Sequence, residues 1–201
     1  MAFIQTLSYL EATGVLKKLY DKVKGPENYI DNILKVHSLR PHTLKGHMEL
    51  YKNVLHHRKN TFPKWFLECL GIYVSILNNC QYCIDHHYQG MRRLLDDEEK
   101  STTIKKKLIT NSFENIFSRD YYLVLRYAEK LTLDPQNIAE SIIIALRSAG
   151  LNDGEILEAN QVISYFNYAN RTVLGLGVST KGDILGLSPN DSDDETNWNH
   201  S

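Results

Sequence analysis

Cysteine is scarce in this chain, with three in 201 residues. So few thiols exclude the disulfide framework that stabilises many small secreted domains. Long apolar runs are also missing, because no stretch approaches the roughly 18 consecutive apolar residues that a membrane-spanning helix needs. The first residues, MAFIQTLSYLEATG, lack a basic segment that leads into an apolar one, so we expect no secretory signal. The sequence therefore predicts a cytoplasmic protein with no membrane partner.

An excess of charge of one sign is lacking too. The formal net charge is -1, and 42% hydrophobic with 23% charged residues is the balance of an ordinary soluble domain. This balance excludes the strongly basic surface typical of nucleic-acid-binding proteins, so we expect no nucleic-acid partner. Only the end, SPNDSDDETNWNHS, is one-sided, and its acidic composition predicts a disordered tail over residues 188–201. We expect one domain over residues 1–187, and removal of residues 189–201 should change neither assembly nor activity.

The alternating pattern of a half-buried strand is absent from the sequence, whereas helical periodicity recurs along it. We therefore predict an all-α fold, a single-domain helical bundle. Proline, glycine and capping residues mark the helix ends, and Asn152 with Glu155 forms the pattern of a capping box. The expected helices cover residues 13–24, a stretch from residue 41, residues 61–77, 80–95, 121–131 and 138–148, and a long last stretch from residue 152.

Two of the three cysteines stand close together in the stretch CQYCIDHH, residues 80–87. On a helix Cys80, Cys83 and His87 share one face, and cysteines at i and i+3 have Cβ atoms roughly 5–6 Å apart, close enough for a disulfide after modest adjustment. His87 follows Cys83 by one turn, where an imidazole can act as base or proton relay for the sulfur. Cys83 is thus the better candidate nucleophile and Cys80 the resolving thiol. The helix dipole, in contrast, favours a thiolate on Cys80, which lies nearer the N-terminus of the helix.

Glu68 is the only charged residue in WFLECLGIYVSIL, a segment that is apolar almost all round and therefore predicts a buried helix. Burying an unpaired carboxylate costs several kcal/mol or forces it to stay protonated. We therefore expect Glu68 to lie against the two thiols and His87. Cys69, its neighbour on the same helix, fits a plain core position.

The Cys-x-x-Cys pattern alone is a weak signal, and two other interpretations of it stay open. The two cysteines pack in a core without any chemistry, or they hold zinc together with His87 and a fourth ligand, Glu68 or His86. No second Cys-x-x-Cys pair supports zinc, so we expect neither a metal nor a cofactor. Haem attachment is excluded, because Ile84 and not histidine follows the second cysteine. Four other histidines are expected to face solvent: His42, His47, His56 and His57. His86 is either a surface neighbour of the site or a hydrogen-bond donor behind it.

Eleven residues separate Glu68 from Cys80, two separate Cys80 from Cys83, and three separate Cys83 from His87. This spacing resembles the signature of the alkylhydroperoxidase D-like proteins in the carboxymuconolactone decarboxylase-like superfamily. The segments YLEATGVLKKLYD, SLRPHTLKGHMELY and LRSAGLNDGEILEANQVISYFNYANRTVLGLGV are similar to the peroxidase-related branch of that family. The resemblance covers roughly residues 8–180 and leaves the tail outside.

The resemblance implies an all-α, homo-oligomeric thiol peroxidase or disulfide reductase. By analogy with the family, Cys83 attacks the peroxide, Cys80 resolves it, and Glu68 and His87 relay protons. Tyr82 departs from the pattern, because well-studied members often carry a histidine between the two cysteines. A further family motif matches at Phe166, Asn167, Asn170 and Arg171, where helix packing or a subunit contact explains the residues as well as substrate binding does.

We therefore expect an antioxidant enzyme that reduces a hydroperoxide through the Cys80/Cys83 dithiol and is regenerated by a dithiol reductant of unknown identity. A disulfide oxidoreductase for a protein or lipoyl partner is the main alternative. A lactone decarboxylase of the wider superfamily is disfavoured, because decarboxylation has no use for a dithiol, and a zinc-stabilised interaction domain would need the metal. Because several helices are apolar on more than one face, we expect a homo-oligomer.

Overall fold

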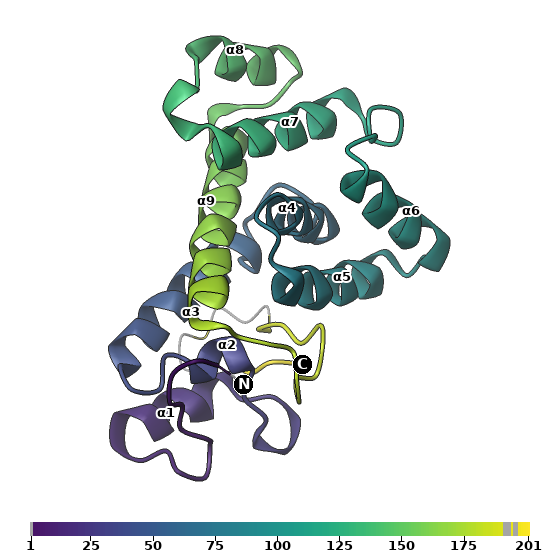
Figure 1. Ribbon diagram of the computed structural model, residues 1–201. Coiled ribbons are helices and arrows are strands. Elements are labelled where there is room, and N and C mark those ends of the chain that lie inside the picture. Colours follow the sequence, from purple (N-terminus) through teal and green to yellow (C-terminus); the bar gives the residue numbers. More distant parts are fainter. Residues whose placement is uncertain (1, 191–193, 195–196) are drawn as a thin grey trace.

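The helical periodicity of the sequence becomes a series of helices in the computed structural model, which describes residues 2–190, 194 and 197–201 (Figure 1). The helices are α1 (Gly14–Val23), α2 (Asn32–Lys35), α3 (Pro41–Leu55), α4 (Lys64–Leu77), α5 (Gln81–Leu95), α6 (Glu98–Ile109), α7 (Arg119–Leu133), α8 (Glu140–Ser148) and α9 (Asp153–Leu176), with short turns η1 (Pro26–Asn28) and η2 (Pro135–Asn137) between them. Within the described residues, the strand-like pairing is limited to one bridge between Pro189 and His200. The predicted all-α, single-domain fold is therefore confirmed. No helix in the described ranges is long and apolar enough to cross a membrane.

The ends of the predicted helices agree with the structure to within a few residues. At the start of α9 the capping box is present: the Glu155 N–H donates to the Asn152 side chain at 3.0 Å, and the Asn152 N–H donates to the Glu155 carboxylate at 2.8 Å. Gly177, with φ +61°, ends the same helix in the left-handed region that glycine tolerates. The sequence does not predict α2, because four residues are too few to show a helical period.

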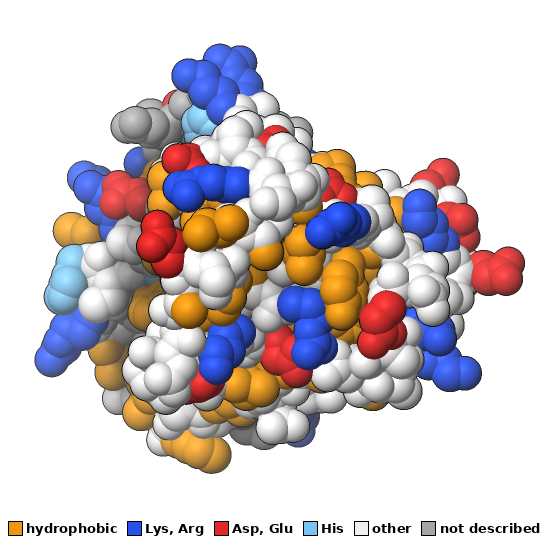
Figure 2. All heavy atoms as spheres, turned by 90° about the horizontal axis from the view of Figure 1, so that it is seen from above, with side chains coloured by type: hydrophobic (Ala, Val, Ile, Leu, Met, Phe, Trp, Pro, Cys, Tyr) orange, Lys and Arg blue, Asp and Glu red, His pale blue; other side chains and the backbone are white. Residues whose placement is uncertain are grey.

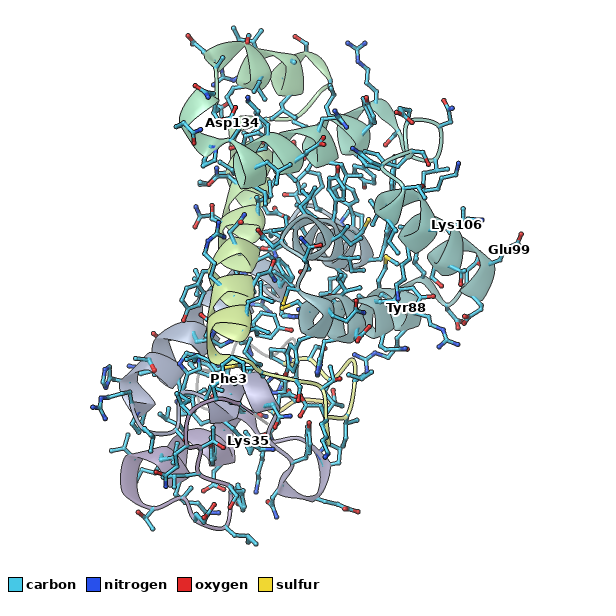
Figure 3. All side chains as sticks on the ribbon, in the orientation of Figure 1. Phe3, Lys35, Tyr88, Glu99, Lys106 and Asp134 are labelled. Atoms are coloured by element: carbon cyan, nitrogen blue, oxygen red, sulfur yellow. The ribbon has the colours of Figure 1, made fainter. Side chains whose placement is uncertain are left out.

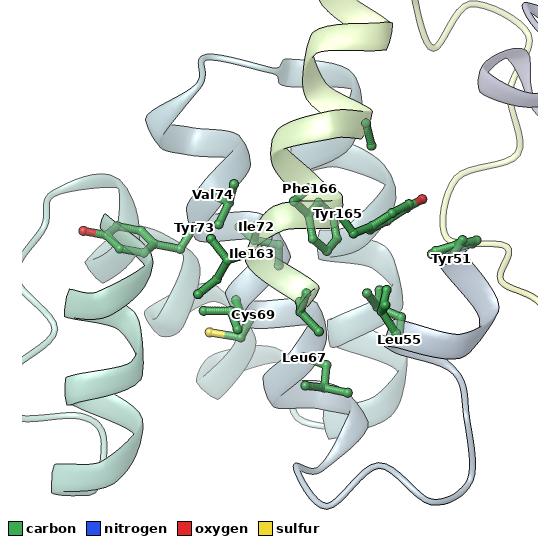
Figure 4. Packing of buried hydrophobic residues seen from close by; sticks show 14 of the residues in the cluster. Tyr51, Leu55, Leu67, Cys69, Ile72, Tyr73, Val74, Ile163, Tyr165 and Phe166 are labelled. Atoms are coloured by element: carbon green, nitrogen blue, oxygen red, sulfur yellow. The ribbon is translucent and has the colours of Figure 1, made fainter. Parts of the chain in front are cut away.

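Helix α4 lies at the centre of the molecule, with α5, α6, α7 and α9 around it (Figure 1). Residues 66–75 of this helix are all buried, as their apolar sequence predicts. Helix α9 packs closely against it at Gly71, where a Cβ atom would lie 2.0 Å from the ring of Phe166. Figure 4 shows Phe166 and Ile163 of α9 beside Ile72 of α4. Any side chain at position 71 would therefore push the two central helices apart.

A tight turn between α4 and α5 presents the cysteines. Asn79 adopts φ +56°, a conformation that asparagine tolerates better than most residues. The Cys80 N–H then donates to the Ser75 carbonyl oxygen at 2.8 Å. Helix α5 begins only at Gln81, so Cys80 caps the helix and does not belong to its first turn. The predicted start at Cys80 is corrected by one residue, because the turn closes on Ser75 before the helical backbone begins.

The chain after α9 forms a C-terminal segment, and its described end packs on the end of α1. This packing differs from the predicted disordered tail over residues 188–201. The Trp198 N–H donates to the Lys22 carbonyl oxygen at 2.9 Å, and His200 Nδ1 lies 2.6 Å from the Val23 carbonyl oxygen. Both side chains are buried. One tryptophan and one histidine thus supply anchoring contacts that the acidic composition obscures. Residues 191–193 and 195–196 of the predicted tail lie outside the described residues.

Candidate active site

The two thiols of the Cys-x-x-Cys pair face each other at the start of α5. The Sγ atoms of Cys80 and Cys83 lie 2.9 Å apart and share a hydrogen bond. Both cysteines are free thiols and buried, with exposed fractions of 0% and 2%. A disulfide needs an S–S distance of about 2.05 Å, so only a small movement of the side chains is required to close one. Cys69 is a separate thiol in the core of α4, and burial raises its pKa.

The two thiols differ in how readily they ionise. Hydrogen bonding from the Cys83 thiol, aided by the Cys83 backbone N–H, lowers the pKa of Cys80 against the opposing effect of burial. Burial raises the pKa of Cys83 well above its ordinary value, and hydrogen bonding from Asn170 and Ser75 opposes that rise. A single negative charge on the resting pair is therefore held mainly by Cys80. Asn170 also donates to the Ser75 hydroxyl at 3.1 Å, so α9 contributes a polar group to the surroundings of the dithiol.

Glu68 and His87 form a hydrogen-bonded pair that links α4 to α5. His87 Nδ1 lies 2.6 Å from Glu68 Oε2, and the Glu68 side chain is almost completely enclosed. Gly90 makes room for the carboxylate, because a Cβ atom there would lie 3.3 Å from Glu68 Cδ. Burial raises the pKa of Glu68, but the charge and hydrogen bond of His87 outweigh it and hold that pKa below its ordinary value. At neutral pH Glu68 is therefore ionised and accepts from the imidazole.

A cavity of about 40 Å³ joins these groups. Cys83, Glu68 and His87 are among the residues that line it, whereas Cys80 is not. A water molecule needs roughly 10–15 Å³ of such space. The cavity therefore has room for a few waters or for a molecule of the size of hydrogen peroxide.

The opposite wall of the cavity comes from α3 and α9. Tyr51 and Tyr165 stack there with 5.3 Å between their ring centroids. His47 packs on Tyr165 at 5.8 Å and His56 on Tyr51 at 4.8 Å; both histidines are buried, so the prediction that they face solvent is wrong. Burial lowers the pKa of each to about 3. The apolar stripe of α3 contains the signal that places His47, because it stands three residues after Leu44 and four before Tyr51.

His86 is also buried, which excludes the alternative that it is a surface neighbour of the site. The C-terminal segment folds over α5 and brings Asp183 Oδ2 to 3.3 Å from His86 Nε2. The hydroxyl groups of Tyr82 and Tyr29 donate to the same carboxylate at 2.8 and 2.6 Å. The hydroxyl of Tyr82 is thus engaged by Asp183 and not by the thiols. Local sequence patterns do not predict this cluster, because Asp183 follows His86 by 97 residues.

The same C-terminal segment covers the cavity. Residues 186–188 and His200 line it together with α5. Arg93 of α5 donates through Nη2 to the Gly186 carbonyl oxygen at 2.6 Å. Gly186 has φ +84°, and a Cβ atom there would lie 2.7 Å from Gln89 Cβ, so glycine allows the segment to approach the helix this closely. This cover is a long-range contact that neither composition nor periodicity reveals.

Possible metal ligands converge at one place in the part of the chain that the structure describes. Asp31, His86 and Asp183 each offer a ligand atom, and these atoms all lie within 4.8 Å of one another. Within the same residues, Cys80 and Cys83 belong to no such group. The zinc-binding alternative that combines these thiols with His87 and Glu68 or His86 is therefore without a geometric basis.

The fold and the site together define an all-helical protein with a buried dithiol, a Glu–His pair and a small cavity between them. No protein-family model and no curated protein matches the sequence. Solved structures do match the fold. An uncharacterized peroxidase-related protein from Ralstonia eutropha, described as an alkylhydroperoxidase AhpD core, has a TM-score of 0.74 at 15% identity, over 89% of this chain and 91% of that one.

Two further structures show the range of proteins that share this fold. A peroxidase-related protein from a Silicibacter species has a TM-score of 0.68 at 24% identity, over 76% of this chain and 78% of that one. A debrominase in complex with a tribromopyrrole has a TM-score of 0.63 at 12% identity, over 82% of each chain. The chain thus has the alkylhydroperoxidase D-like fold that its motif indicated, and the debrominase shows that this fold serves more than one chemistry.

Proposed function

We propose that the protein is a thiol peroxidase that reduces hydroperoxides through the Cys80/Cys83 dithiol. The observation that carries this proposal is that the dithiol and the Glu68–His87 pair lie at one cavity. The two sulfur atoms are 2.9 Å apart, and Cys83, Glu68 and His87 line the cavity. A nucleophile and a proton-transfer pair thus line a space of hydroperoxide size, and the resolving thiol lies in contact with the nucleophile. The fold shared with peroxidase-related proteins supports the same interpretation.

Cys83 is the thiol that attacks the substrate in this proposal, because it lines the cavity and Cys80 does not. The lower pKa of Cys80 is compatible with that role. The two sulfurs share a hydrogen bond, so a proton that moves from Cys83 to Cys80 leaves the thiolate on the sulfur that faces the cavity. Asn170 and Ser75 then stabilise the charge there by hydrogen bonding.

The reaction proceeds in two steps. The Cys83 thiolate attacks the outer oxygen of the hydroperoxide, an S–O bond forms, the O–O bond breaks, and the departing alkoxide takes a proton from the Glu68–His87 pair to leave as an alcohol. Cys83 is now a sulfenic acid. The Cys80 sulfur attacks that sulfur, an S–S bond forms, and the hydroxyl leaves as water with the Cys80 proton. A dithiol reductant reduces the disulfide to two thiols and is itself oxidised to a disulfide.

We also propose that the protein works in the cytoplasm as a homo-oligomer. A reducing compartment keeps the dithiol available for a new cycle. Large apolar side chains remain exposed on several helices: Leu133, Ile144 and Leu157 are exposed by 59%, 52% and 60%. Figure 2, which looks down on the end that carries α8, shows apolar side chains among charged ones. Association of copies would remove part of this apolar surface from water.

Peroxide consumption tests the proposed function. Reduced protein is mixed with hydrogen peroxide and one reductant, either dithiothreitol or dihydrolipoamide, and the consumption of peroxide is measured. The disulfides that form without a reductant are identified by peptide mapping. We expect catalytic consumption and a Cys80–Cys83 disulfide that dithiol reverses, in the wild type and in a Cys69→Ala control. Disulfide exchange without peroxide consumption would favour the oxidoreductase alternative. A disulfide that contains Cys69 would contradict the site.

A further inference from the structure

A second cluster of polar groups lies between three segments that are far apart in the sequence, and two of its members, Asp31 and His86, also line the cavity of the candidate active site. Asp31 precedes α2, His86 belongs to α5, and Asp183 lies in the C-terminal segment, which runs beside α2 and α5 in Figure 1. One ligand atom from each lies within 4.8 Å of the other two. Asp31 and His86 are exposed by only 6% and 9%, and the Asp183 side chain is fully enclosed. The proposed peroxidase mechanism uses none of these three residues.

The hydrogen bonds of the two carboxylates are unequal. Asp183 is well supplied, because the Tyr29 and Tyr82 hydroxyls and the Asn32 N–H all donate to it, at 2.6, 2.8 and 3.2 Å. Asp31 is not, because its buried Oδ1 has no hydrogen-bond partner. A buried carboxylate oxygen without a partner is costly, and in native proteins it usually signals a bound water or ion. Asp31 Oδ1 is therefore an oxygen atom that a bound cation could coordinate.

The charges of the cluster do not balance by themselves. When both carboxylates are ionised, the cluster carries a net charge of about -1 even with a protonated imidazole. Lys35, which Figure 3 shows on α2, makes its contacts outside the cluster: its Nζ donates to Asn32 at 3.2 Å and lies over the Tyr29 ring. A divalent cation held by two carboxylates and a neutral imidazole would bring the cluster to zero charge.

We propose that Asp31, His86 and Asp183 form a binding site for a divalent cation of the zinc or manganese type. Carboxylate oxygen and imidazole nitrogen are the donors that these ions accept. The separation of 3.3 Å between His86 Nε2 and Asp183 Oδ2 equals the distance of about 3.3 Å between two ligands of a tetrahedral ion with bonds of 2.0–2.1 Å. Tyr29 and Tyr82 orient the Asp183 carboxylate through their hydroxyls, as hydrogen-bond donors behind a metal ligand do.

The cation would have a definite structural effect, because its three ligands come from different segments. It would tie Asp183 to α5 and to the turn before α2. Residues 186–188, which line the cavity together with Cys83, begin three residues after Asp183. Metal binding would therefore hold the C-terminal cover in place over the cavity. This effect needs no thiol chemistry, so it stands or fails independently of the proposed peroxidase function.

Metal titration of the purified full-length protein, stripped with a chelator, tests the site. Calorimetry with Mn²⁺ and absorption spectroscopy with Co²⁺ are suitable, because thiolate ligation of Co²⁺ gives intense charge-transfer bands that oxygen and nitrogen ligands do not give. We expect one equivalent to bind in the wild type and in a Cys80→Ser/Cys83→Ser protein, without those bands. Asp31→Asn and His86→Gln should weaken binding by tenfold or more. Asp85→Asn is the matched control, since this carboxylate neighbours His86 but bonds Gln81, and it should bind like the wild type.

Folding and proteolysis measurements complete the test. Asp31→Asn keeps the shape of the residue and removes a carboxylate whose buried Oδ1 has no partner. In chelator its melting temperature should therefore equal or exceed that of the wild type, while the rise in melting temperature on adding Mn²⁺ should disappear. Mn²⁺ should also slow proteolytic cleavage within residues 183–190 of the wild type. The proposal is overturned if the wild type binds no cation, if Asp31→Asn binds as tightly as the wild type, if binding is lost with the two cysteines, or if cleavage is equally fast with and without Mn²⁺.

Discussion

Glu68→Gln removes one charge from the site while it keeps nearly the same volume. Glutamine can still hydrogen-bond His87 across the 2.6 Å contact, and His87 can release its proton, so no uncompensated charge is buried and the protein should fold. The proton-transfer function should be lost, because an amide neither stabilises a protonated imidazole nor carries a proton to the departing alkoxide. General acid–base groups contribute about 10²–10⁴-fold, so the reaction of Cys83 with peroxide should slow by that factor, a rise of about 3–5 kcal/mol in the barrier.

A single-turnover experiment with excess peroxide, followed by quenching and labelling of the remaining thiols, measures that step directly. Glu49→Gln is the matched control: the same chemical change on α3, at an exposed carboxylate that pairs with Lys45 at 3.5 Å, should leave the rate unchanged. A Glu68→Gln protein that is folded and reacts at the wild-type rate would refute the role of the Glu68–His87 pair.

Three further predictions concern stability, the C-terminal cover and assembly. Burial lowers the pKa of His47 and His56 from 6.5 to about 3, so the folded state binds fewer protons than the unfolded state between these two pH values. The unfolding free energy is therefore highest above pH 6.5 and falls as the pH drops, by up to about 2 kcal/mol for each histidine at pH 5. Denaturant unfolding at pH 7.5 and pH 5 would measure this difference. An unfolding free energy that is equal at the two pH values would contradict their burial. Deleting residues 189–201 removes the buried Trp198, so it should lower the unfolding free energy, by at most about 3 kcal/mol because the gain in chain entropy offsets part of the lost burial. The deletion also opens the cavity, so it should speed the reaction with cumene hydroperoxide relative to that with hydrogen peroxide. An unchanged ratio of the two rates would show that the segment does not limit access. Sedimentation at micromolar concentration should show species larger than a monomer, and a monomer alone would contradict self-association.

Local patterns in the sequence were enough to predict the frame of the molecule. The apolar run around Glu68 predicts the buried helix at its centre, and the Asn152–Glu155 pattern predicts the capping box that starts α9. The i, i+3 spacing of the two cysteines predicts that they lie near each other, which the Sγ–Sγ distance of 2.9 Å confirms. Each of these features depends on residues within one or two helical turns, which is why periodicity and capping rules reach them.

Long-range contacts account for what the sequence did not predict. His86 and Asp183 meet only because the chain returns to α5 after α9, and no local rule describes that return. The acidic composition of the C-terminal segment predicts disorder, although Trp198 and His200 anchor the segment on α1. The composition predicts that removal of residues 189–201 changes neither assembly nor activity. The structure predicts instead that removal changes reactivity, because His200 of this segment lines the cavity. His47 is an intermediate case. Its position on the apolar stripe of α3 predicts burial, whereas its polar side chain favours the surface.

Trapping of a sulfenic acid in two single variants tests most directly whether Cys83 is the peroxidatic thiol of a Cys80/Cys83 dithiol. Each variant, Cys80→Ser and Cys83→Ser, is treated with one equivalent of hydrogen peroxide in the presence of a dimedone-type probe, and the labelled residue is found by peptide mass spectrometry. Cys80→Ser should react once and carry the probe on Cys83, since nothing resolves the sulfenic acid, and it should over-oxidise when peroxide is in excess. Cys83→Ser should consume no peroxide and carry no probe, because a serine hydroxyl is hardly ionised near neutral pH. A probe adduct on Cys80 in Cys83→Ser, with none on Cys83 in Cys80→Ser, would reverse the two roles, and no adduct in either variant would contradict the peroxidase function.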